Sequence, residues 1–122
     1  MIMENTFELL PWHDAELLNI CIDRSDSGNN DIITLSIIWP DGQYNNIIFF
    51  DCYKFDAELN FGIIAKETIR EAIILNESDR LNEIRNKWNK IGVNLSDLKC
   101  IKIDTNSTNS SLIIYSKGFK IT

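Results

Sequence analysis

The feature that most constrains the fold is a period of two in the apolar residues of the first half of the chain. Apolar side chains recur at every second position in the segments 15–23 and 31–39, at Leu18, Ile20, Ile22, Ile33, Leu35, Ile37 and Trp39. Successive side chains of a β-strand point to opposite faces, so this spacing predicts two strands that are each buried on one face. The turn-forming residues 25–30 (SDSGNN) and 40–42 (PDG) follow them and predict tight connections.

A third strand is expected from about Tyr44 to Tyr53, where apolar residues occur on both faces. Strands of this kind lie inside a sheet rather than at its edge. Two further strands are expected over 98–104 and 111–115, and the tail 118–122 (GFKIT) is expected to add a short edge strand. The sequence therefore predicts an antiparallel sheet of five to six strands.

Two segments of the second half have helical spacing instead. Residues Ala65, Ile69, Ala72 and Ile73 recur three or four positions apart and predict a helix over 64–75. The second helix is indicated by apolar residues on one face, with Ser78 or Asn76 as its N-cap and Gly92 as its C-cap; the apolar residues are Leu81, Ile84, Trp88 and Ile91. Residues 1–122 are thus expected to form one α+β domain, a curved antiparallel sheet in the order β-β-β-α-α-β-β packed against two helices.

The charge is distributed unevenly along this layout. Residues 1–62 hold eleven acids and two bases, a net of −9, whereas residues 63–122 hold seven acids and ten bases, a net of +3. The whole chain is acidic, with a net charge of −6 and a pI of about 4.7, which argues against direct binding of nucleic acid. In an antiparallel meander, the end of the first strand, the first loop and the end of the third strand share one pole, so the acids are expected to gather there.

No catalytic motif stands out in the sequence. Asp51 is the acid most surrounded by apolar residues, and a catalytic role for His13, the only histidine, would need Asp14 or Asp41 in the same cleft. Cys21, Cys52 and Cys100 are isolated from one another in apolar segments and are expected to be small core residues. No metal and no cofactor are expected, since metal-ligand and phosphate-loop spacings are absent.

The N-terminal residues lack the basic and apolar regions of a signal peptide, and no segment is long and apolar enough to span a membrane. A cytoplasmic location without membrane contact is therefore expected. The acidic first half also holds Trp12, Trp39, Tyr44, Tyr53 and Phe55. Aromatic residues within a charged rim are favoured contacts in protein interfaces, so a binding surface for a cationic protein is expected. Two other hypotheses stay open: a small ligand bound on the concave face of the sheet, and a hydrolase that uses His13.

The opening WHDAELLNICID at 12–23 and the strand IIFFDCY at 47–53 resemble those of small bacterial immunity proteins from contact-dependent growth inhibition and polymorphic toxin systems. The resemblance covers about the first half and implies a monomeric, non-enzymatic cytoplasmic protein that neutralises a cognate toxin domain. Such toxins are frequently nucleases with basic clefts, which an acidic surface would occupy. On this reading the partner-binding residues are expected to be Asp23, Asp26, Asp31, Asp56 and Glu58, with Tyr53 and Phe55 as aromatic contacts.

Overall fold

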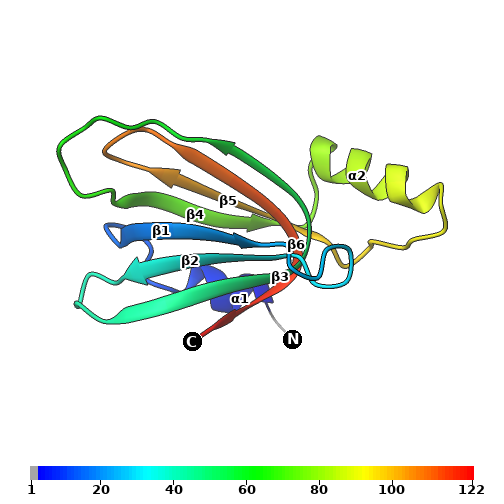
Figure 1. Ribbon diagram of the computed structural model, residues 1–122, viewed down its shortest axis with the longest axis horizontal. Helices are drawn as coiled ribbons and strands as arrows, with labels where there is room; N and C mark the ends of the chain where they lie inside the picture. Colours follow the sequence, from blue (N-terminus) through cyan, green and yellow to red (C-terminus); the bar gives the residue numbers. More distant parts are fainter. Residues whose placement is uncertain (1–2) are drawn as a thin grey trace.

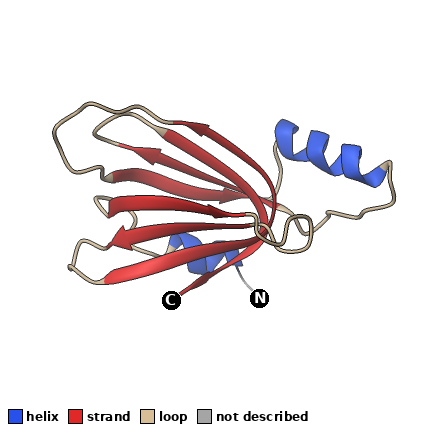
Figure 2. Ribbon diagram, in the orientation of Figure 1, coloured by secondary structure: helices blue, strands red, loops and turns tan. Residues whose placement is uncertain are grey.

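The computed structural model describes residues 3–122 and is an antiparallel β-sheet of six strands with two short helices (Figures 1 and 2). The elements follow the chain in the order α-β-β-β-β-α-β-β. Their bounds are α1 Met3–Glu8, β1 Glu16–Asp23, β2 Ile32–Ile38, β3 Tyr44–Glu58, β4 Ile69–Leu75, α2 Asp79–Asn89, β5 Lys99–Thr105 and β6 Ser111–Ile121. The expected α+β class with a curved sheet is confirmed, but the expected order of the elements is wrong.

The strand order across the sheet is β1-β2-β3-β6-β5-β4, so β1 and β4 are the two edge strands and β3 lies inside, as expected. The sheet curls until these two edges touch at one end. There Glu16 forms an isolated bridge with Thr68, and the amide of Leu17 donates to the carbonyl of Glu67 at 2.8 Å. The outer edge of β1 beyond Leu17 has no neighbouring strand within the part of the chain that the structure describes.

The main core lies inside this curl. It combines aliphatic residues of all six strands with an aromatic group at one end, formed by Phe7, Trp12, Trp39, Phe49 and Phe119. The rings of Phe7 and Phe119 meet edge to face with their centroids 5.3 Å apart. Phe7 belongs to α1, which sits against β4, where the amide of Ile74 donates to the Glu8 carboxylate at 3.2 Å. The helix therefore closes one end of the curl, and no helix was expected there from the sequence pattern.

A second apolar cluster holds α2 on the outer side of the sheet. Its buried members are Leu81, Ile84, Leu95, Leu98, Cys100 and Tyr115. The helix begins where expected, because the extended Ser78 accepts a hydrogen bond from the amide of Leu81. Its C-cap is Lys90 rather than the expected Gly92, which lies in the left-handed turn that follows.

The helix expected over 64–75 is wrong, because residues 69–75 form β4. The buried side chains of β4 are Ile69, Ala72 and Ile74. A β-bulge between Ile69 and Glu71 inserts one residue into the alternation, so the inward-facing positions are first three and then two residues apart. That first interval imitates the spacing of a helix.

A second bulge, between Leu17 and Asn19, corrects the expected face of β1. Leu17 and Ile20 pack against the core, whereas Leu18 and Ile22 are exposed. The three cysteines are also not all core residues: Cys100 is buried, Cys52 is half-buried and Cys21 is exposed. The strand expected over 111–115 continues to Ile121, so the tail belongs to β6 and is not a separate strand.

Candidate functional site

Three adjoining cavities lie where the loop 24–31, the middle of β3 and α2 meet, and Tyr53 lines all three. Their volumes are about 350, 540 and 250 Å³. We call this region the Tyr53 groove. Its other principal lining residues are Arg24, Asp31, Asp51, Cys52, Lys54, Phe55, Arg80, Glu83, Lys87, Trp88 and Ile91.

A bend in β3 places Tyr53 in the groove. Asp51 has a left-handed backbone with φ 51°, and the register of β3 against β6 shifts between Cys52 and Lys54. Because of this irregularity, Cys52 and Phe55 pack towards the main core while Tyr53 packs towards the cluster under α2. The Tyr53 ring meets Trp88 of α2 edge to face, with the ring centroids 5.1 Å apart.

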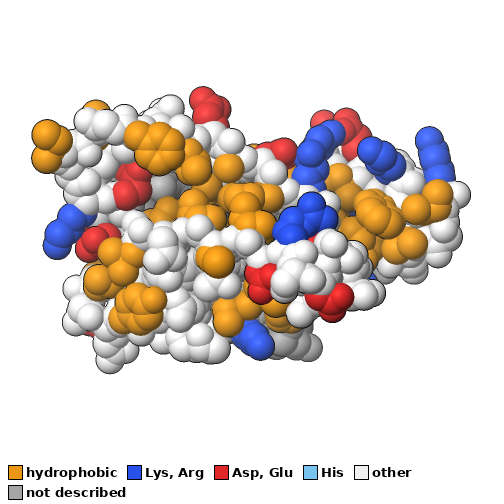
Figure 3. Space-filling view, viewed as in Figure 1, with side chains coloured by type: hydrophobic (Ala, Val, Ile, Leu, Met, Phe, Trp, Pro, Cys, Tyr) orange, Lys and Arg blue, Asp and Glu red, His pale blue; other side chains and the backbone are white. Residues whose placement is uncertain are grey.

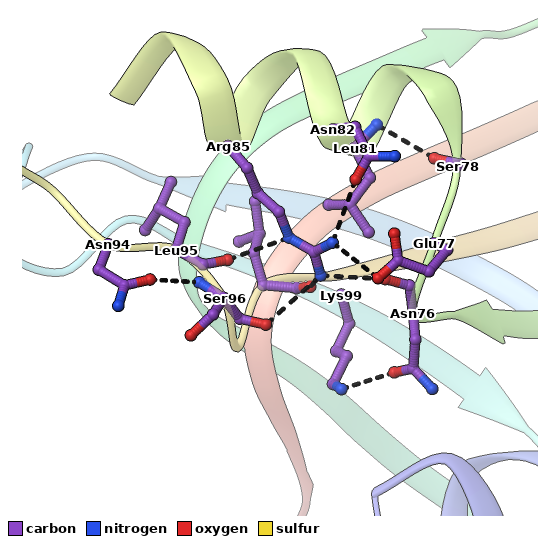
Figure 4. A network of polar contacts seen from close by, with 11 residues as sticks. Asn76, Glu77, Ser78, Leu81, Asn82, Arg85, Asn94, Leu95, Ser96 and Lys99 are labelled. Atoms are coloured by element: carbon purple, nitrogen blue, oxygen red, sulfur yellow. Dashed lines mark hydrogen bonds and ion pairs between the residues drawn. The ribbon is translucent and has the colours of Figure 1, made fainter. Parts of the chain in front are cut away.

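The wall formed by α2 is held in place by Arg85 (Figure 4). Its guanidinium donates to the backbone carbonyls of Asn76, Leu95, Ser96 and Leu98, of which the bond to Leu98 is the shortest at 2.8 Å. These carbonyls precede and follow the helix in the chain, and a planar group with five N–H donors can reach them together. Arg85 thus ties both ends of the helical segment to each other.

The opposite wall is the loop 24–31, whose acids are engaged in its own turn structure. Asp23 accepts from the amide and hydroxyl of Ser25, and these bonds hold the pKa of the Asp23 carboxyl below its ordinary value of 3.8. Asp31 accepts from the amide of Gly28 and from Arg24 at 3.1 Å, which likewise lowers the pKa of Asp31. The carboxylates are therefore charged at neutral pH and fixed in position.

The charge of the groove differs between its two walls. The loop 24–31 carries two acids, Asp26 and Asp31, and one base, Arg24, and follows directly on Asp23. The exposed face of α2 beside the groove carries Arg80, Glu83 and Lys87. Lys54 lies between the walls and pairs with Asp56 at 3.4 Å. Figure 3 shows basic and acidic side chains close together around the apolar surface beside α2. The groove is thus bipolar rather than uniformly acidic.

The residues expected to bind a partner are brought together only in part. Asp31, Tyr53 and Phe55 line the groove, and Asp56 lies beside Lys54. Asp23 is the last residue of β1, and Asp26 lies in the loop that follows it. Glu58 is separate, because β3 bends and continues until Glu58 stands opposite Ser111 at the far end of the strand. The expected common pole therefore does not include Glu58.

The His13 and Asp14 pair lies where the edges of the sheet meet. His13 Nδ1 is 3.2 Å from the carbonyl oxygen of Arg70, and Nε2 is 3.6 Å from the Asp14 carboxylate. The imidazole is exposed and lines none of the four described cavities. Asp41 is in the turn between β2 and β3, where it accepts from the amide of Gln43. The positions of His13 and Asp14 therefore fit a role in joining the two edges of the sheet, and Asp41 lies apart from them.

The thiols of Cys52 and Cys100, near the groove, are partly or fully buried and are not activated as nucleophiles. Desolvation raises the pKa of Cys52 to about 12 and also raises the pKa of Cys100, which disfavours the nucleophilic thiolate. Within residues 3–122, no group of three or more histidine, cysteine or acidic side chains is arranged to hold a metal ion.

A fourth cavity, of about 420 Å³, was missed by the sequence reasoning. It lies between β1 and the segment 59–65, and we call it the apolar mouth; its principal apolar lining residues are Leu17, Leu18, Ile20, Leu59, Phe61 and Ile63. The signal for it was present in the sequence, because the run LNFGIIA at 59–65 holds no charged residue. The expectation of a helix over 64–75 obscured that signal.

No protein-family model, curated protein or solved structure matches this chain. Among the residues that the structure describes, neither helix has the length and apolar character needed to cross a bilayer.

Proposed function

We propose that this chain is an immunity-type protein that binds a toxin domain, a nuclease with a basic cleft, through the Tyr53 groove and so neutralises it. The observation that carries the proposal is that Tyr53 lines three adjoining cavities while its ring packs on Trp88 between two charged walls. Aromatic side chains that are held rigidly inside a polar rim are favoured contacts in protein interfaces.

The two walls suggest how the toxin would be oriented. The acids of the loop 24–31 would receive the basic residues that normally bind nucleic-acid phosphates, and the Arg80 and Lys87 side would face an acidic group of the toxin. Because the groove is bipolar, electrostatic attraction would set orientation as well as rate. The protein would act as a monomer in the cytoplasm, where the toxin would otherwise reach its substrate.

Two alternatives have less support in the geometry. The concave face, which a small ligand would need, is filled at the α1 end by Phe7 and its aromatic neighbours. A hydrolase based on His13 would need a cleft around it, and His13 instead lies exposed beside the Arg70 carbonyl.

The first test is whether a large secreted protein with a variable C-terminal domain is encoded beside this gene, and that domain is then expressed as the candidate toxin. Its affinity for the chain is measured by calorimetry, and its nuclease activity is measured with and without the chain. Tyr53→Ala is expected to weaken binding at least about tenfold. The matched control is Tyr44→Ala, which removes an exposed tyrosine outside the groove and is expected to leave the affinity unchanged.

The electrostatic part is tested separately by measuring the association rate between about 50 and 500 mM salt. Asp26→Lys is expected to slow association, and Glu71→Lys, on the exposed part of β4, serves as the control for net charge. A rate that does not depend on salt would rule out the electrostatic part. Undiminished nuclease activity in the presence of excess chain would contradict the proposed function.

A further inference from the structure

We propose that the apolar mouth binds an extended apolar segment of a partner protein, flanked by Lys or Arg, which pairs with the outer edge of β1. The residues that line the apolar mouth differ from those that line the Tyr53 groove, and of the β1 edge 18–22 only Ile22 also lines that groove. The proposal does not depend on the proposed binding of a toxin.

The first argument is the free edge of β1. The hydrogen bonds that the structure gives this outer edge end at Leu17, whose amide bonds to Glu67. The next five residues, 18–22 (LNICI), carry no charge and include the exposed Ile22. Natural edge strands are usually protected by charges, prolines or a covering segment, because an open edge readily pairs with another strand. Here the edge stays open, and an added strand would satisfy its backbone groups.

The second argument is the apolar side chains beside that edge. Phe61 exposes 83% of its surface and Ile64 is fully exposed, with Leu59 and Ile63 also exposed. Contiguous exposed apolar surface of this kind marks an interaction site. Figure 3 shows hydrophobic side chains gathered across this face of the molecule. An extended segment along β1 would direct every second side chain into the cavity of about 420 Å³.

The third argument is the charge at the rim, which selects the occupant. Asp23 lies at the far end of β1 and Glu58 lies where the apolar segment begins, while Lys66 already faces Glu16 at 3.8 Å. A strand with basic ends would complement these acids. A second copy of this chain would instead bring its own Asp23 and Glu58 and a further net charge of −6, and an anionic membrane would be repelled.

The test selects binders from a phage-displayed library of random twelve-residue peptides on the full chain. Selected peptides are expected to alternate apolar residues with other residues and to carry Lys or Arg near their ends. Phe61→Ser is expected to weaken their binding at least about tenfold. Leu9→Ser is the matched control, because Leu9 is also 83% exposed but does not line the mouth, and it should leave binding unchanged.

Backbone pairing is tested on the peptide, so that the fold of the chain is not disturbed. N-methylation of every second residue, in the phase that faces β1, is expected to abolish binding, and methylation in the other phase should be tolerated. Tyr53→Ala should not affect this binding, which separates the result from the test of the proposed function. The proposal is overturned if no selected peptide depends on Phe61. It is equally overturned if Phe61→Ser dissolves a dimer seen by ultracentrifugation, or removes binding to phosphatidylcholine or phosphatidylglycerol vesicles.

Discussion

The amide of Ile69 donates a 2.7 Å hydrogen bond to the carbonyl of Ala15, and its own carbonyl accepts from the amide of Asp14 at 2.8 Å. These bonds join residues more than fifty positions apart and bring the start of β4 against the segment before β1. The WHDA motif at 12–15 therefore has a structural role in this fold. The buried Ala15 leaves space for the two backbones to approach.

Asp14 makes this junction through an unusual backbone conformation, with φ 67°. Asp and Asn tolerate this left-handed region, whereas a β-branched residue does not. We expect Asp14→Val to lower the free energy of unfolding by about 1–3 kcal/mol and Asp14→Asn to change it by less than about 1 kcal/mol. Urea denaturation measures both. Equal stability of the two variants would show that the left-handed conformation does not limit this position.

Gly118 of β6 lies opposite Phe50 of β3, and the Phe50 ring occupies the space where a β-carbon would be. Gly118→Ala should therefore displace the ring and lower the free energy of unfolding by about 1–3 kcal/mol. Replacing Phe50 by Leu in the same chain should recover part of the loss. A double-mutant cycle by chemical denaturation measures the coupling, and additive effects of the two changes would contradict the contact.

Arg85→Lys should destabilise the α2 segment, since an ammonium cannot reach the carbonyls that the guanidinium bonds together. We expect a loss of about 1–2 kcal/mol in thermal or chemical unfolding, with faster amide hydrogen exchange around residues 76–98. Arg80→Lys on the same helix is the control, because Arg80 pairs with Glu83 on the exposed surface, and its effect should stay below about 0.5 kcal/mol. Similar losses in the two variants would contradict the role given to Arg85.

The thiols should differ in reactivity towards iodoacetamide at about pH 8.5. Cys21 is exposed, whereas burial raises the pKa of Cys52 to about 12 and raises that of Cys100. A thiol whose pKa lies above the pH of the reaction contains little thiolate, so Cys21 should be alkylated first. Peptide mass spectrometry over time measures the order. Labelling of Cys52 as fast as Cys21 would show that β3 opens around its bend.

The free energy of unfolding at acidic pH should depend on Asp23 and Asp31, the two acids that flank the loop between β1 and β2. The pKa values of Asp23 and Asp31 lie below 3.8 in the folded chain, so their carboxylates stabilise the fold above pH 3.8, and this contribution is lost as the pH falls through the lowered pKa values. NMR titration of the carboxyl carbons measures the pKa values of Asp23 and Asp31. Arg24→Gln should raise the pKa of Asp31 only in part, because the Gly28 amide makes the larger contribution, and should leave Asp23 unaffected.

Sequence reasoning succeeded where a residue's neighbours along the chain decide its structure. The strands around Leu35 and Ile48 and the helix capped by Ser78 all follow from local spacing and capping. It failed at β4, where the bulge at Ile69 turns the period of two into an interval of three. Of the candidate site, Asp31, Tyr53 and Phe55 were correctly placed near one another, but the charge of the α2 wall was not foreseen.

The sequence by itself determined that this chain forms an antiparallel sheet with an acidic first half, because alternation and charge are written along the chain. Only the tertiary structure decided which acids lie close together and which basic residues lie beside them. The bend at Asp51 carries Glu58 away from the loop acids, and α2 brings Arg80 and Lys87 beside Tyr53. Bulges and long-range packing depend on contacts between distant segments, and these leave no periodic signal at either partner.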